Sequence, residues 1–332
     1  MPNNRQSARL TEFKSLLAAT TRIPIVAAPM FLVSGPDLVV AACQAGVIGS
    51  FPTPNCRTAA ALDEWMRAIT ERLAQAKAAD PSARIAPWAV NLITHSTNTR
   101  LADDLKVIAA YKPPVVITAL GSPKPAIDVV QGYGGLVIAD VISLNLARKA
   151  VAAGADGIAC VAAGAGGHTG SLSPFAFLSA VREFFDGLVI LGGGIGDGAG
   201  VAGAIAAGAD LVYMGTSFIA TEESIANPRH KELVVQSAIE DIIVSAAITG
   251  TPASWIKRSL HDAGYTIDEL GQKPVRLYDS NQAKPARWSE TFAAGQAVGT
   301  SKAIESTASV VERLAGQYFA AAKRLSAATA TS

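Results

Sequence analysis

Eight short apolar runs recur along the chain, and they constrain its fold more than any other feature. Each run is uniformly apolar rather than alternating, which is typical of strands buried on both faces of a parallel sheet. The runs are IPIVAA (23–28), GVIGS (46–50), PWAVNLI (87–93), PVVITAL (114–120), GLVIAD (135–140), DGIACV (156–161), GLVILG (187–192) and DLVYMG (210–215). We therefore expect a buried parallel sheet with helices covering it.

Helical segments separate these runs. Residues 58–79 are the clearest, because their apolar positions lie on one helical face: Leu62, Trp65, Met66, Ile69 and Leu73. Residues 147–161 resemble 202–215, and both pass from a helix end through a glycine into a strand. A βα unit used eight times predicts a (β/α)8 TIM barrel. An open, doubly wound sheet is the alternative, although it usually has fewer strands.

The alternation of apolar runs and helical segments ends after Phe218. Residues 219–287 contain polar, helix-like segments and turn signals but no clear buried strand, so we expect a small, mainly helical insertion that covers the site. The barrel would then comprise residues 1–218 and 288–325. Residues 300–325 are predicted to form the closing helix, with these positions facing inward: Ala303, Val310, Val311, Leu314 and Phe319.

The composition excludes several classes of protein. The 332 residues carry a net charge of +1 with scattered Lys and Arg, which argues against a nucleic-acid partner. The N-terminus has no apolar signal core, and no apolar run reaches the roughly 18 residues of a membrane helix. Cys43, Cys56 and Cys160 lie far apart, so we expect neither a disulfide framework nor a zinc site. These features predict a cytoplasmic protein with no membrane partner, and they leave open whether it is a monomer or a homodimer.

Glycines follow the last two apolar runs. They give the endings Gly192-Gly193-Gly194 and Gly215-Thr216. In a barrel, active sites form at the carboxyl ends of the strands, and phosphate sites are commonly built from the loops after strands 7 and 8. A helix beginning near Asp197 would add its positive end. We predict a bound phosphate, and so a phosphorylated cofactor or substrate; the alternative is that the glycines only permit tight turns.

The Rossmann fingerprint is incomplete in this loop. Gly192 and Gly194 match its first two glycines, but Asp197 stands where the last glycine belongs. We therefore discount NAD binding by that route.

His168 lies in the stretch VAAGAGGHTGSLS (161–173), after the sixth run. Ala165, Gly166 and Gly167 precede it, and the glycines would let a flat ligand lie against the backbone. An imidazole at the end of a barrel strand titrates near neutral pH and can take or give a proton. We predict a catalytic role for His168; the alternative is a structural histidine.

The other candidate groups give weaker signals. We expect a loop hydrogen bond for His95, solvent-facing positions for His230 and His261, and a core position for Cys160. No trio of His, Asp or Glu has the spacing of a metal site, so we expect no metal.

Several motifs occur in one order and together resemble the nitronate monooxygenase family. They are Ala28-Pro29-Met30 after the first run, Asn91 in AVNL, AGAGGHTG around His168, GGGI at 192–195, MGTSF at 214–218 and AAGQAVG at 293–299. The resemblance covers about residues 20–325. It implies an FMN-bound TIM barrel with a small second domain.

The resemblance also implies a site for each part of the cofactor. The FMN phosphate would bind Gly193, Gly194, Gly215 and Thr216. The ring would lie near Ala28, Pro29, Met30, Asn91 and the glycines before His168. Gln296 and Gly299 match a late segment that also borders the flavin, and His168 matches the family's catalytic histidine.

The implied activity is oxidation of nitronates or nitroalkanes by O2 to carbonyl compounds and nitrite. Two alternatives stay open: an NAD(P)H-dependent FMN reductase acting on quinones or enoyl thioesters, and a non-catalytic barrel that binds a phospholigand. One position departs from the pattern. Some relatives carry Lys or Gln at the end of the fifth strand, where this chain has Asp140. A carboxylate there would disfavour negative charge on a reduced flavin.

Overall fold

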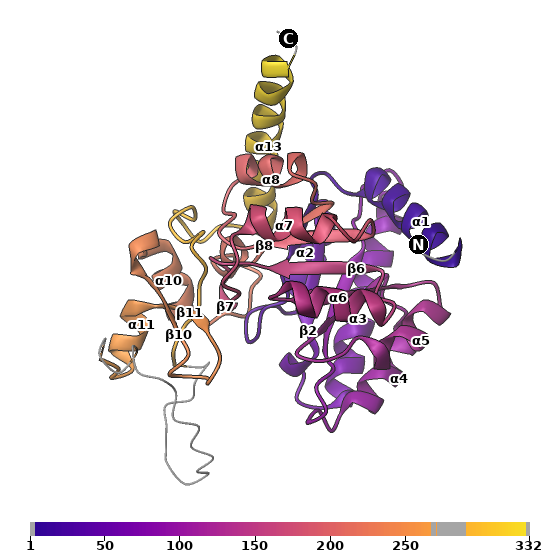
Figure 1. Cartoon of the computed structure of the whole chain (residues 1–332), viewed down its shortest axis with the longest axis horizontal. Helices are drawn as coiled ribbons and strands as arrows, with labels where there is room; N and C mark the ends of the chain where they lie inside the picture. The colour runs from indigo at the N-terminus through magenta and orange to yellow at the C-terminus, as the bar shows by residue number, and fades with distance from the viewer. Residues whose placement is uncertain (1–3, 267–269, 271–289, 330–332) are drawn as a thin grey trace.

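A closed barrel of eight parallel strands forms the body of the molecule (Figure 1). The computed structural model describes residues 4–266, 270 and 290–329. The barrel strands follow one another around the barrel in chain order, and β9 pairs with β1 to close it. They are β1 (Ile25–Ala27), β2 (Ile48–Pro52), β3 (Trp88–Ile93), β4 (Val115–Ala119), β5 (Leu136–Val141), β6 (Gly157–Val161), β8 (Leu188–Gly192) and β9 (Leu211–Met214). Each of the eight apolar runs supplies one strand, which confirms the predicted (β/α)8 barrel.

Helices surround the barrel and cover the outer faces of its strands. The first helix, α1 (Asn4–Thr20), precedes β1. The helices that follow the strands are α2 (Pro36–Gln44), α3 (Ala59–Ala79), α4 (Leu101–Tyr111), α5 (Lys124–Gly132), α6 (Leu144–Ala152), α7 (Pro174–Arg182), α8 (Gly198–Ala206) and α13 (Thr307–Thr329). Short helical turns lie at η1 (Thr53–Asn55) and α9 (Thr216–Ile219).

Local sequence signals fix where these helices begin and end. The Thr58 hydroxyl accepts a hydrogen bond from the Ala61 N–H, which caps α3 at the predicted start. The repeated helix–glycine–strand turn has the same form in both copies, because Gly154 and Gly208 have φ values of 98° and 108°. Glycine adopts this left-handed conformation without the Cβ penalty of other residues.

Apolar side chains fill the barrel interior. Alternate residues of each strand point inward, among them Val26, Ile138 and Ile190. Helix α1 closes the amino-terminal end of the barrel with Phe13 and Leu17, which pack on the same cluster. The opposite, carboxyl end is therefore the end left for a site.

An ion pair fastens α1 to the barrel. Arg9 Nη2 lies 2.8 Å from Asp156 Oδ1, and the Asp156 side chain is fully buried. The other carboxylate oxygen of Asp156 accepts hydrogen bonds from the Val137 N–H and from Gln131 Nε2, each at 3.0 Å. This carboxylate is therefore compensated on both oxygens.

The last helix completes the outer layer. In α13, Val310, Val311 and Leu314 are buried as predicted. Two expected inward positions are wrong: Ala303 precedes the helix and is exposed, and Phe319 is 53% exposed, where α13 extends away from the body (Figure 1).

The small domain contains the expected helices and also two strands that were not predicted, β10 and β11. It includes α10 (Pro228–Gln236), η2 (Ile239–Asp241), β10 (Ile242–Ser245), β11 (Ala253–Ile256) and α11 (Lys257–Asp262). β11 pairs antiparallel with β10 and also with β7 (Gly167–His168), which belongs to the loop after β6. β11 reads ASWI, in which Ser254 interrupts the apolar residues although all four positions are buried. Residues 267–269 and 271–287 of the expected insertion, and residue 288 where the barrel was expected to resume, lie outside the described residues.

Arg9→Ala tests the role of the ion pair between α1 and the barrel. It leaves the buried Asp156 carboxylate without its cation, so we expect the free energy of unfolding to fall by about 3 kcal/mol. Urea denaturation followed by circular dichroism measures the change. The control is Arg72→Ala, which breaks an exposed ion pair with Asp37 and should cost less than about 1 kcal/mol. Equal losses in the two variants would contradict this account.

Candidate active site at the barrel mouth

The predicted site residues lie at the carboxyl end of the barrel strands. Asn91 and Asp140 are inside β3 and β5, and Gly192 is the last residue of β8. Ala28, Pro29 and Met30 follow β1 and are partly buried, whereas Gly215 and Thr216 follow β9. The structure thus places the ends of five strands around one opening.

The loops after β6 and β8 approach each other closely. The Gly194 N–H donates to the Gly164 carbonyl at 3.1 Å. Gly193 has a φ of 134°, and a Cβ at this position would lie 2.6 Å from the Ala163 carbonyl oxygen. Only glycine fits there, so the sequence GGG leaves a cradle of bare backbone.

The late segment around Gln296 joins this cradle. The Gln296 N–H donates to the Gly164 carbonyl at 2.9 Å, and the Gly295 N–H donates to Thr216 Oγ1 at 2.9 Å. Thr216 and Gln296, predicted from separate motifs, are therefore connected through one segment. Gly299 lies further along, where its nearest neighbours are Ser237 and Ala238.

The segment after β1 borders the same cradle. A Cβ on Gly215 would lie 3.2 Å from Met30 Sδ and 3.7 Å from Ala28 Cβ. One residue beyond Thr216, the Ser217 hydroxyl is buried and has no hydrogen-bond partner. A buried hydroxyl without a partner is costly unless a ligand or water satisfies it. Close backbone approach in the cradle and a buried hydroxyl without a partner one residue after Thr216 are features that suit a phosphate group.

His168 stands on the short strand β7 at the edge of the small sheet. Its Cα is paired with that of Ala253 in β11, so the insertion fixes the backbone that carries the imidazole. Ala165 is partly buried in the loop before β7, and Gly166 before the strand is exposed. The His168 side chain is exposed to solvent on one side, yet the surrounding protein desolvates it and lowers its pKa. The imidazole is therefore neutral at pH 7 and able to accept a proton.

Three hydrogen-bonded polar side chains, Asn91, Asp140 and Tyr213, lie at the base of the mouth. Tyr213 Oη donates to Asp140 Oδ1 at 3.2 Å, and Asn91 Nδ2 donates to Asp140 Oδ2 at 3.4 Å. Burial raises the pKa of Asp140 to about 7, and the hydrogen bond from Tyr213 acts in the opposite direction. Tyr213 was not among the predicted site residues, although a phenol two residues before Gly215 in an apolar strand was a usable signal.

The remaining histidines differ in part from expectation. His95 Nδ1 lies 2.8 Å from Thr97 Oγ1, as expected for a loop hydrogen bond, and His261 is exposed as predicted. His230 is not solvent-facing. It is buried, its Nε2 lies 2.8 Å from the Ala293 carbonyl, and its ring stacks on Phe292. Burial lowers its pKa to about 4, which is the behaviour of a neutral core histidine.

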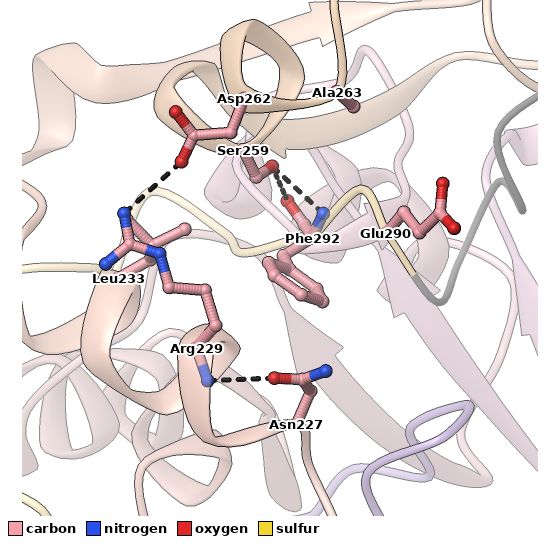
Figure 2. A pocket seen from close by; sticks show the side chains of 8 residues that line it. All are labelled: Asn227, Arg229, Leu233, Ser259, Asp262, Ala263, Glu290 and Phe292. Carbon is pink, nitrogen blue, oxygen red and sulfur yellow. Dashed lines mark hydrogen bonds and ion pairs between the residues drawn. The ribbon is translucent and has the colours of Figure 1, made fainter.

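A separate pocket of about 340 Å³ lies in the small domain (Figure 2). Two contacts stabilise the residues that line it. The Ser259 hydroxyl accepts a hydrogen bond from the Phe292 N–H at 2.9 Å, and Arg229 forms an ion pair with Asp262 at 3.2 Å. The Ser259 contact fixes the chain just before it enters the segment around Gln296. The pocket is lined by Asn227, Arg229, Leu233, Ser259, Asp262, Ala263, Glu290 and Phe292.

The described part of the chain has no candidate metal site, no membrane-spanning helix and no disulfide. There, no group of three His, Cys, Asp or Glu side chains could hold a metal ion. None of the described helices has both the length and the apolar character needed to span a bilayer. All three cysteines are buried and unpaired, Cys160 in the core as predicted.

The fold and the mouth define a TIM barrel with a glycine-lined cradle and an exposed histidine at the carboxyl ends of its strands. The chain belongs to the nitronate monooxygenase family, whose model matches residues 13–315. It is therefore a flavin-dependent oxidoreductase of this family.

Individual relatives agree with this assignment. A nitronate monooxygenase of Paraburkholderia phytofirmans is 30% identical, with 92% of this chain and 89% of that protein covered. A dehydrogenase of a hydroxy-methyl-oxo-octahydroindene carboxyl-CoA from Rhodococcus jostii is 28% identical over 69% of this chain and 61% of that protein. Among solved structures, a nitroalkane oxidase from Streptomyces ansochromogenes has a TM-score of 0.76 at 25% identity, covering 93% of this chain and 99% of that one. FabK from Thermotoga maritima has a TM-score of 0.75 at 26% identity, with 95% and 98% covered.

Gly193→Ala tests whether the cradle holds the flavin. The added Cβ would push the loop after β8 away from the Ala163 carbonyl, and we expect the Kd for flavin to rise at least about tenfold. Quenching of flavin fluorescence by the apoprotein measures it. The control is Gly134→Ala, which has a similar positive φ of 91° but open space around it, before β5. Unchanged affinity in Gly193→Ala would show that the cradle does not bind the cofactor.

Proposed function

We propose that this protein is an FMN-dependent nitronate monooxygenase, which oxidises alkyl nitronates and nitroalkanes with O2 to carbonyl compounds and nitrite. The observation that carries the proposal is the place of His168. A neutral imidazole stands on β7 beside the loop that helps to form the glycine cradle, and β11 holds its backbone. A base at such a position can take the acidic α-proton of a nitroalkane.

The residues present fit FMN. Gly193, Gly194, Gly215 and Thr216 would hold its phosphate, with Gln296 beside them. Ala28, Pro29, Met30, Asn91 and the loop from Ala165 to Gly167 would border the ring, and Asp140 would lie beneath it. Gly192 would form the end of β8, and Gly299 would lie in the segment that follows Gln296. When bound, FMN supplies the electron transfer between substrate and O2.

His168 performs the proton step in this mechanism. Its neutral imidazole nitrogen accepts the α-proton of the nitroalkane and holds it while the substrate anion forms. A nitronate arrives already deprotonated and does not need this step. The floor formed by Asn91, Asp140 and Tyr213 closes the mouth from below and separates the substrate from the apolar barrel interior.

A second candidate function is an NAD(P)H-dependent FMN reductase that acts on quinones or enoyl thioesters. The observation that favours it is the similarity to the Rhodococcus jostii dehydrogenase, whose name specifies a CoA-bound substrate. Anaerobic mixing separates the two functions. We expect the flavin to be reduced by a nitronate and not by NADPH; rapid and complete bleaching by NADPH, with no response to nitronate, would reject the monooxygenase. A purified chain that is colourless and cannot be reconstituted with FMN would favour a phospholigand-binding barrel.

His168→Asn tests the proposed base. We expect turnover of neutral nitroalkanes to fall about a hundredfold or more, because a positioned general base contributes about 10²–10⁴. Oxidation of preformed nitronate should change much less, and FMN should stay bound. Oxygen consumption and nitrite release measure both rates. The control is His261→Asn, at an exposed histidine of α11. A nitroalkane rate equal to that of the wild type would make His168 structural.

A further inference from the structure

Asp140 occupies the centre of the barrel rather than its wall. Its hydrogen-bond partner Asn91 stands on β3, two strands away around the barrel, and Tyr213 stands on β9, three strands away in the other direction. Side chains from three non-adjacent strands meet only in the barrel interior. The carboxyl group therefore lies near the barrel axis, directly below the mouth.

The surroundings make a permanent charge at this place unfavourable. Beneath Asp140 the interior is filled by apolar side chains such as Ile138 and Ile190. Towards the mouth, Ala28 and Gly192 present little side chain. A carboxylate here is stabilised by its two hydrogen bonds but poorly by solvent, and burial raises the pKa of Asp140 to about 7.

The groups packed around Asp140 do not titrate in the same range. Tyr213 stays neutral because burial and the neighbouring carboxylate raise the pKa of its phenol well above 10. Asn91 carries no proton equilibrium, and Ala159 of β6 lies opposite Asp140. Thr118 of β4 pairs with Ala139, and its hydroxyl donates to the Ile138 carbonyl. The pKa of His168 on β7 lies below its usual value, so the imidazole is already neutral above pH 7. Around pH 7, Asp140 is the group among these whose charge changes.

We propose that Asp140 takes up a solvent proton when the bound flavin gains negative charge on reduction, and releases it on reoxidation. The inference rests on the proposed FMN site. The electrons come from the substrate or a chemical reductant, and they leave to O2. The carboxylate gains one proton to become a carboxylic acid, which removes the repulsion between two negative charges in a poorly solvated space. The Tyr213 hydroxyl and the Asn91 amide hold the carboxyl group in place through both states.

The pH dependence of the flavin midpoint potential tests this directly, because it gives the protons bound per two electrons. At about pH 8 the wild type should bind about one more proton than Asp140→Asn. At about pH 5.5 the difference should vanish, because Asp140 is then protonated in both redox states. Asp128→Asn, at an exposed carboxyl of α5, is the matched control and should behave as wild type. Equal proton counts for wild type and Asp140→Asn at pH 8 would overturn the inference.

Two further measurements locate the proton. The reduced-minus-oxidised infrared spectrum of the wild type at pH 8 should contain the carbonyl band of a protonated carboxylic acid, and this band should be absent in Asp140→Asn. Tyr213→Phe removes the hydroxyl that stabilises the carboxylate, so the extra proton uptake should begin at a higher pH than in the wild type. An unshifted onset, or an infrared band that persists in Asp140→Asn, would contradict the proposal.

These measurements use chemical reduction and need no nitronate. A chain that binds FMN but does not oxidise nitronates would therefore end the proposed function and leave the inference about Asp140 to its own result. A chain that binds no flavin would overturn both.

Discussion

The filling of the barrel interior is the constraint on which the site depends. Eight parallel strands turn alternate side chains inward, and these side chains are apolar from the plug formed by α1 up to the level of Ile138 and Ile190. At the next inward level the interior becomes polar, where Tyr213 spans the barrel to reach Asp140. Above that level three of the strands end in small residues, β1 at Ala27, β4 at Ala119 and β8 at Gly192. The hydrogen-bonded group of Asn91, Asp140 and Tyr213 therefore marks the upper boundary of the apolar filling.

The small domain also positions the loop that carries His168. Its strand β11 pairs with Gly167 and His168, so the loop after β6 becomes the edge of a second sheet. The hydroxyl of Ser254, also on β11, is buried without a hydrogen-bond partner beside this edge. An apolar cluster that includes Val33, Ile219 and Ile256 joins the small domain to the barrel mouth. The position of the proposed base is therefore set by contacts between two parts of the chain that are far apart in sequence.

Much of the barrel could be predicted from the sequence, because strands buried on both faces are uniformly apolar and the turns between units repeat the same glycine. The glycines after β8 and β9 could also be singled out from the sequence, and the structure shows the close approach at Gly193, where a Cβ would lie 2.6 Å from the Ala163 carbonyl oxygen. The strands β10 and β11 were missed because each has only four residues and one of them is a serine, Ser245 in β10 and Ser254 in β11. His230 was misplaced for a related reason. Its neighbours are polar, yet its ring stacks on Phe292 from a distant segment. Tyr213 was not predicted because a hydrogen bond across the barrel interior produces no periodic pattern in the sequence.

The closing helix has a consequence for how the chain is made. Val310, Val311 and Leu314 of α13 belong to the same apolar cluster as Ile25 of β1 and Met214 of β9. Gly198 of α8 approaches so closely that a Cβ would lie 2.1 Å from the Leu314 carbonyl oxygen. During synthesis, all eight strands leave the ribosome before this helix exists. The seam between the first and last strands therefore stays uncovered for roughly a hundred residues of translation, and the nascent barrel has to be protected from aggregation during that interval.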